Sequence, residues 1–215
     1  MMRERAATPI ALTLAASFAG CSLLARSVPA THRYQLAPTT AVAEIPPTAR
    51  IELRNVTGSE PFQDTGIAYQ TSPYRLDTYK FHRWVEPPTD LVSERLHEII
   101  YSPSPVGPET AAAHPLLLDT RIKAFQEVDD GAQHTGVVAI RFCIFPRDPF
   151  SRALWCKVIS KESPAGGDTP EQAAEAISMS FNQVMAEFAS ELTAEIRQVA
   201  SDGAAKESRP SAGSQ

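Results

Sequence analysis

The chain has 215 residues, 43% of them hydrophobic, which is enough for one folded domain with a sizeable core and additional tails. Its 20 basic and 25 acidic residues give a net charge of −5, without the concentrated positive charge of nucleic-acid-binding proteins, so no nucleic-acid partner is expected. Its 18 prolines gather where segments end and act as breakers and turn formers.

Residues 1–20 have the pattern of a cleavable signal peptide. After two arginines, an apolar stretch runs from Ala6 to Ala19; at about fourteen residues it is shorter than the roughly 20 that span a bilayer. It ends in Phe18-Ala19-Gly20-Cys21, which resembles a lipobox, the motif whose cysteine is lipidated and becomes N-terminal. We therefore expect acyl chains such as palmitate on Cys21 and a tether over residues 21–33; the alternative is an ordinary secretory signal with an incidental cysteine.

The next part of the chain predicts strands and a first helix. Residues 37–48 are proline-rich and are expected to form an extended loop. Alternating or continuous hydrophobic residues then predict strands at 51–56, 66–70 and 74–80, with a hairpin turn at Ser72-Pro73. After Pro87-Pro88, hydrophobic residues at helical spacing predict an amphipathic helix over residues 89–101.

The second half repeats this order of elements. Strands are predicted at 116–128, 136–145 and 153–160, with a turn at Asp129-Asp130-Gly131. Thr169-Pro170-Glu171-Gln172 is a capping-box pattern, which predicts the start of a long helix of about 30 residues. Residues 201–215 lack large apolar residues and are expected to be a disordered tail. The βββα-βββα order predicts an α+β, two-layer sandwich with two helices on a mostly antiparallel sheet.

Two cysteines fall in neighbouring predicted strands. If the turn is symmetric about residues 148–150, Cys143 lies directly opposite Cys156, within reach of a disulfide. The alternative is two buried thiols one register apart. The odd cysteine is then the lipid-bearing Cys21.

Aromatic residues concentrate over the first hairpin and form the candidate partner- or lipid-binding set. Such side chains present an apolar body and a polar tip, which suits a lipid or a partner surface; the alternative is packing within the core. Trp84 is the favoured member, because Pro87-Pro88 fixes the loop beside it. The set is Tyr69, Tyr74, Tyr79, Phe81 and Trp84.

Motifs for catalysis or cofactor binding are missing from the sequence. The five histidines are not spaced as metal ligands, and there is no Gly-x-Ser-x-Gly elbow or phosphate-binding glycine loop. No catalytic residue, metal or cofactor is expected, and the chain is predicted not to be an enzyme.

Several weak motifs occur in a characteristic order: Tyr34-x-Leu36, Ile51-x-Leu53-x-x-Val56, Gly66-Ile67-Ala68-Tyr69, the aromatic run ending at Trp84, and Pro87-Pro88. In this order, residues 34–200 resemble the ABC-type transport auxiliary lipoprotein family, whose members accompany Mce-type (mammalian cell entry) lipid transporters.

The resemblance implies a periplasmic accessory protein that docks an Mce subunit and its ABC permease and ATPase and aids the movement of phospholipid or other hydrophobic cargo between membranes. Ser22 after the lipidated cysteine favours the inner leaflet of the outer membrane, and a homo-oligomer is compatible with this role. The alternative is an outer-membrane structural or assembly lipoprotein unrelated to lipid transport.

Overall fold

The computed structural model describes residues 29–46, 49–101, 115–147 and 151–207. The chain divides into a unit that ends at Ala30 and a unit that begins at Thr31, and the description below concerns the second unit. Cys21, the predicted signal peptide and residues 208–215 lie outside the described residues.

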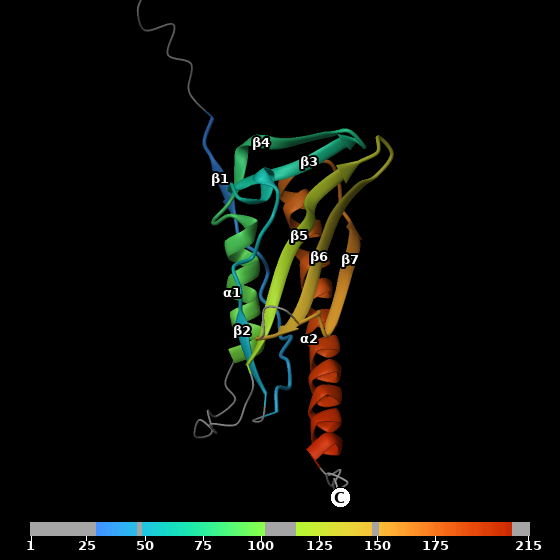
Figure 1. Ribbon diagram of the computed structural model, residues 1–215. Coiled ribbons are helices and arrows are strands. Elements are labelled where there is room, and N and C mark those ends of the chain that lie inside the picture. The colour runs from blue at the N-terminus through green and yellow to red at the C-terminus, as the bar shows by residue number, and fades with distance from the viewer. Residues whose placement is uncertain (1–28, 47–48, 102–114, 148–150, 208–215) are drawn as a thin grey trace, which may run out of the picture. The chain divides into compact units, whose positions relative to one another are not determined.

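Seven strands form one mixed sheet, and two long helices accompany it (Figure 1). Six strands follow the order β1-β4-β3-β5-β6-β7, and β2 also pairs with β5. The bounds are β1 His32–Tyr34, β2 Arg50–Leu53, β3 Gly66–Ser72, β4 Arg75–Trp84, β5 Pro115–Asp129, β6 His134–Pro146 and β7 Trp155–Pro164. The helices are α1 Pro88–Tyr101, α2 Pro170–Glu207 and the short 3₁₀ helix η2 Glu60–Phe62.

The predicted α+β class and its two helices are confirmed, and β1 is an additional strand. The first two residues of β1, His32 and Arg33, were assigned to the tether, because so short a strand shows no periodicity; all three residues of β1 pair in parallel with the end of β4. The sheet is mixed, since β2 and β3 also run parallel to β5, while the pairings of β3 with β4, β5 with β6 and β6 with β7 are antiparallel.

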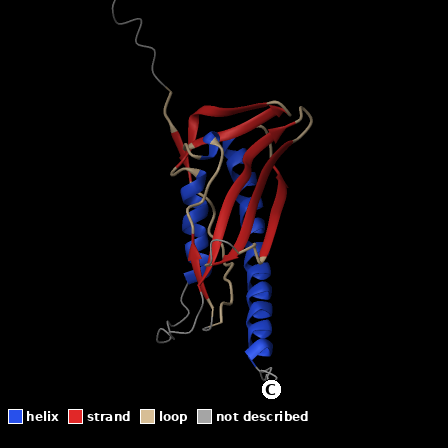
Figure 2. Ribbon diagram, viewed as in Figure 1, coloured by secondary structure: helices blue, strands red, loops and turns tan. Residues whose placement is uncertain are grey.

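The hydrophobic core lies between the sheet and the helices (Figure 2). Edge-to-face ring contacts join Trp84 to Phe125 at 5.6 Å and Phe125 to Phe181 at 5.7 Å, so β4, β5 and α2 share one aromatic cluster. Farther along α2, Phe188 stacks on Phe142 of β6 at 4.1 Å. These rings are fully buried, and each is expected to contribute several kcal/mol to folding, about 3–5 kcal/mol by truncation to alanine.

An extended segment, residues 35–45, hydrogen-bonds to both helices, and we call it the strap. On the α2 side, the Ser178 hydroxyl oxygen accepts a hydrogen bond from the Ala37 amide at 2.8 Å. On the α1 side, the Ala43 amide donates to the Ile99 carbonyl at 3.0 Å, and the Arg95 Nη2 donates to the Ala37 carbonyl at 3.2 Å. The strap is therefore held to both helices by hydrogen bonds of its backbone, although it belongs to neither helix nor sheet.

The N-terminus of α2 has the predicted capping box. The Thr169 hydroxyl donates to Gln172 Oε1 at 2.8 Å and accepts the Gln172 amide at 3.3 Å. The helix continues to Glu207, beyond the predicted end near residue 200 and into the segment 201–215 that was expected to be disordered; the alanines at 204 and 205 favour helix there. Within the described ranges, no helix is both long and apolar enough to cross a membrane.

Gly136 on β6 is the point where α2 approaches the sheet most tightly among the described glycines. A Cβ atom added there would lie 2.3 Å from the main chain of Ala176 and Ile177. The Ser180 hydroxyl, also on α2, donates to the Gly136 carbonyl at 2.7 Å. Position 136 therefore has no room for a side chain.

We expect Gly136→Ala to lower the free energy of unfolding by about 1–3 kcal/mol, because the helix backbone must move away from β6. Urea denaturation measures the change. Gly166→Ala is the matched control, since its added Cβ would meet only Gln172 Nε2 at 3.5 Å. Equal stability of the two variants would contradict the close approach of α2 to β6.

Candidate functional site

The members of the predicted aromatic set differ widely in their exposure to solvent. Trp84 has no exposed surface and contacts Phe125 in the core. The expectation that Trp84 contributes to an accessible surface is therefore wrong. The physical reason is that β4 ends where β1 and the core meet, so this indole fills the interior instead of facing solvent. Tyr74 is at the opposite extreme, 98% exposed in the turn between β3 and β4.

The other members of the set are partly buried. Tyr69 on β3 and Tyr79 on β4 lie side by side, with ring centroids 4.7 Å apart. Phe81 lies farther along β4, with the Lys80 ammonium 5.2 Å from its ring centroid. The structure thus brings Tyr69 and Tyr79 together, leaves Tyr74 alone at the hairpin tip, and separates Trp84 from all of them.

The two tyrosines belong to a longer series of rings across three strands, which we call the ring row. From β1 come His32 and Tyr34, and from β4 comes His82, whose ring centroid is 5.1 Å from that of His32 and 6.0 Å from that of Tyr79. The Tyr34 hydroxyl also lies 2.8 Å from His82 Nδ1. Burial, followed by the charge of His32, lowers the pKa of His82. The ring row thereby fastens the short edge strand β1 to β4.

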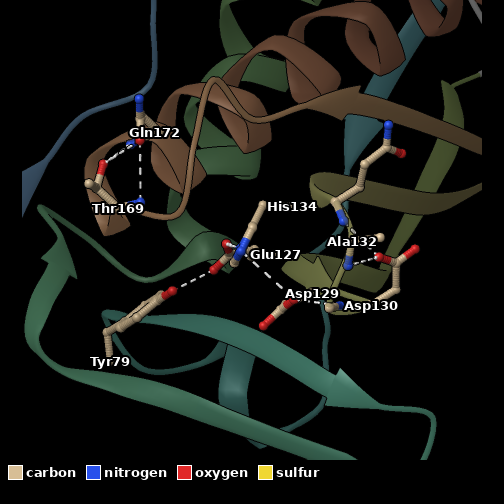
Figure 3. Close-up of polar contacts among 10 residues, drawn as sticks. Tyr79, Glu127, Asp129, Asp130, Ala132, His134, Thr169 and Gln172 are labelled. Atoms are coloured by element: carbon tan, nitrogen blue, oxygen red, sulfur yellow. Dashed lines mark hydrogen bonds and ion pairs between the residues drawn. The ribbon is translucent and has the colours of Figure 1, made fainter.

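Glu127 connects the ring row to the β5–β6 hairpin (Figure 3). Its side chain is 1% exposed, and its Oε2 accepts a hydrogen bond from the Tyr79 hydroxyl at 2.5 Å. Its other oxygen, Oε1, lies 2.7 Å from Nδ1 of His134. A buried carboxylate is stable only when its oxygens have such partners, so this cluster holds three strands, β4, β5 and β6, in one arrangement.

The cluster changes the protonation of its members. The hydrogen bond to the Glu127 carboxylate raises the pKa of His134, and the carboxylate of Asp129, 3.8 Å from Nε2, acts in the same direction. Burial, followed by the hydrogen bond to Glu127, raises the pKa of Tyr79. In the adjoining turn, the Ala132 and Gln133 amides donate to Asp130 and lower the pKa of its carboxyl. The raised pKa of His134 favours its protonated form beside the Glu127 carboxylate.

The geometry of the cluster fits a role in stabilising the sheet better than a role in catalysis. A general base needs an oxygen or nitrogen that can reach a substrate proton. Both oxygens of Glu127 are already engaged and the side chain is almost fully covered. Among the described residues, no group of three or more His, Cys, Asp or Glu side chains is arranged to hold a metal ion.

We expect the stability of the protein to fall as pH rises through the raised pKa of His134. A group whose pKa is higher in the folded state stabilises the fold fully below its ordinary pKa of 6.5 and loses that contribution above its folded value. The difference in unfolding free energy between the wild type and His134→Asn should therefore shrink as pH increases. Urea denaturation over a pH series measures it, with the exposed His97→Asn as control; a difference independent of pH would contradict this linkage.

The two cysteines of the β6–β7 pair lie opposite one another, in the register expected from the sequence. Their Cα atoms are 4.1 Å apart, and their sulfur atoms are joined in the structure. Cys143 is buried and Cys156 exposed. A disulfide there joins β6, which packs against α2, to the edge strand β7.

The Cys143–Cys156 bridge stays a prediction, and a thiol count tests it. Alkylation of the native, unreduced protein, followed by mass spectrometry, should label neither cysteine. Reduction before alkylation should label both. Modification of both residues without reduction would show that the pair is not bridged.

Sequence reasoning missed Glu127, His134 and His82, which it treated as ordinary strand residues or solvated histidines. One signal was available for Glu127: it is two residues from the buried Phe125, so both side chains point to the same face of β5. The partners of that carboxylate come from other strands, and no local pattern reveals them.

Comparison with solved structures defines the class of fold. The chain is similar to a Xanthomonas campestris protein of the family DUF330, with a TM-score of 0.64 and 14% identity, over 79% of this chain and 99% of that one. It is also similar to an uncharacterized protein, with a TM-score of 0.56 and 15% identity, over 76% of this chain and 99% of that one. At such low identity these similarities establish a shared fold and nothing more.

The family follows from the sequence. Residues 34–189 match the model of the ABC-type transport auxiliary lipoprotein component, and the chain belongs to this family. No curated protein matches the chain. The resemblance inferred from the weak motifs is thus confirmed, and the family is one of transport accessory proteins and not a known enzyme family.

Proposed function

We propose that this protein is an accessory lipoprotein of an Mce-type lipid transport system, anchored in the cell envelope through Cys21. Membership in the transport auxiliary family over residues 34–189 carries the proposal. In this function the protein faces the periplasm from the inner leaflet of the outer membrane. It docks the Mce subunit of the transporter, with its ABC permease and ATPase, and aids the passage of phospholipid.

The lipobox-like sequence supports the anchor. A single acyl chain binds a membrane only marginally, whereas two or three give stable attachment. The eleven Cα–Cα steps from Cys21 to His32 span at most about 40 Å when fully extended. A lipid on Cys21 therefore keeps the start of β1 within that distance of the membrane surface.

The hairpin tip is the docking element that we propose. Tyr74 is 98% exposed in the turn, and Leu76, at the start of β4, is 37% exposed, so both side chains are accessible at this end of the hairpin. The Tyr79–Glu127 hydrogen bond lies on the same hairpin and fixes it to β5. A rigid, projecting aromatic side chain loses little conformational entropy on binding, which favours it as an anchor for a partner protein.

Purification of the tagged, lipidated protein from envelope membranes tests the proposed function. We expect an Mce subunit and phospholipid to be recovered with the wild type. Tyr74→Ala should reduce the recovery of the subunit severalfold, while Met179→Ala, an exposed apolar residue on α2, should not.

Two results would count against the proposal. Recovery of other envelope proteins without an Mce subunit would favour a structural or assembly lipoprotein. Absence of acyl chains from Cys21 in the mass spectrum of the purified protein would remove the proposed anchor.

A further inference from the structure

A groove lies between the strap and α1, and the residues that line it belong to neither the ring row nor the hairpin tip. Its volume is about 690 Å³, and its lining comes from the strap, the loop after β4 and α1. Val42 and Val85 in this lining are 55% and 37% exposed, and Leu36 and Leu91 are buried there. The groove is large enough for a short peptide segment and small for a folded domain.

Acidic side chains line this groove. Glu86, Glu94 and Glu98 all belong to the lining, and all three residues are exposed. Glu98 is paired with Arg95 at 3.0 Å. In the part of the chain that the structure describes, Glu86 and Glu94 have no basic partner within ion-pair distance. The groove thus carries excess negative charge that a cationic ligand would balance.

Arg95 fixes α1 to the strap along the groove. Its side chain is 10% exposed, and it is the one basic residue among those lining the groove. Nε pairs with Glu98, Nη2 donates to the strap at Ala37, and the guanidinium lies over the Phe181 ring, 5.8 Å from its centroid. Because Arg95 is already engaged in this way, it leaves the charge of Glu86 and Glu94 unbalanced.

We propose that the groove binds a cationic, partly apolar peptide segment of another protein. Lysine or arginine side chains of the segment pair with Glu86 and Glu94, and an apolar side chain covers Val42 and Val85. A peptide meets both requirements together, whereas a simple cation or polyamine would meet only the first.

The test uses the full, lipidated chain in nonionic detergent and a fluorescent, amidated peptide of alternating leucine and lysine. We expect saturable binding by fluorescence anisotropy, weakened by added salt, and none with a peptide of alternating leucine and glutamate. The double variant Glu86→Gln/Glu94→Gln should bind about fivefold more weakly. The control Glu162→Gln/Glu175→Gln, at two exposed acidic residues on β7 and α2, should bind like the wild type.

Val42→Ser separates the apolar contribution from the charge, and it should weaken binding about threefold at every salt concentration. The thermal midpoints of all variants should match the wild type, because the substituted residues are exposed.

Four outcomes would overturn the proposal. They are no binding of the leucine–lysine peptide, equal loss in the groove and control variants, displacement of the peptide by phosphatidylethanolamine, and self-association of the chain that the groove variant abolishes. The groove does not depend on the proposed transport function. Recovery of an Mce subunit without peptide binding would refute the groove alone, and peptide binding without that subunit would leave the groove intact.

Discussion

The fold depends on the hydrogen bonds that β5 makes along both of its edges. One edge pairs with β6 for nearly its whole length, and the other is shared by β2, the single bridge at Thr57 and β3. A buried strand must satisfy every backbone group, so three separate pieces of the N-terminal half are aligned on this one edge. The position of β3 then determines that of β4, and the position of β4 determines that of β1.

The cluster around Glu127 follows from this arrangement. Glu127 lies near the C-terminal end of β5, where β3 pairs with it and where β6 begins after the turn. Tyr79 and His134 therefore reach the same carboxylate from opposite sides. The polar cluster of Glu127 therefore lies at this end of the sheet, whereas the strap hydrogen-bonds to the helices and the groove lies beside α1. The two candidate surfaces, the hairpin tip and the groove, consequently use different residues and different elements.

Elements with strong local patterns were predictable from the sequence, and contacts between distant segments were not. The capping box at Thr169, the periodicity of α2 and the register of Cys143 opposite Cys156 depend on neighbouring residues, and the structure has all three. The strand β1 was missed because its three residues are defined only by β4. Trp84 was misplaced because an aromatic residue near a proline-bounded loop is compatible with surface or core, and only the packing on Phe125 decides.

The pairing of β2 and β3 with β5 also constrains the order in which the protein folds. β5, β6, β7 and α2 follow one another in the chain, so each strand pairs with the next. By contrast, β2 and β3 are synthesised well before β5, the strand with which both pair. Such non-local parallel pairings slow folding, and unpaired strand edges are prone to aggregation. A chain released before residue 115 therefore exposes two strand edges without their partner, and premature termination should yield insoluble or rapidly degraded fragments instead of a smaller folded domain.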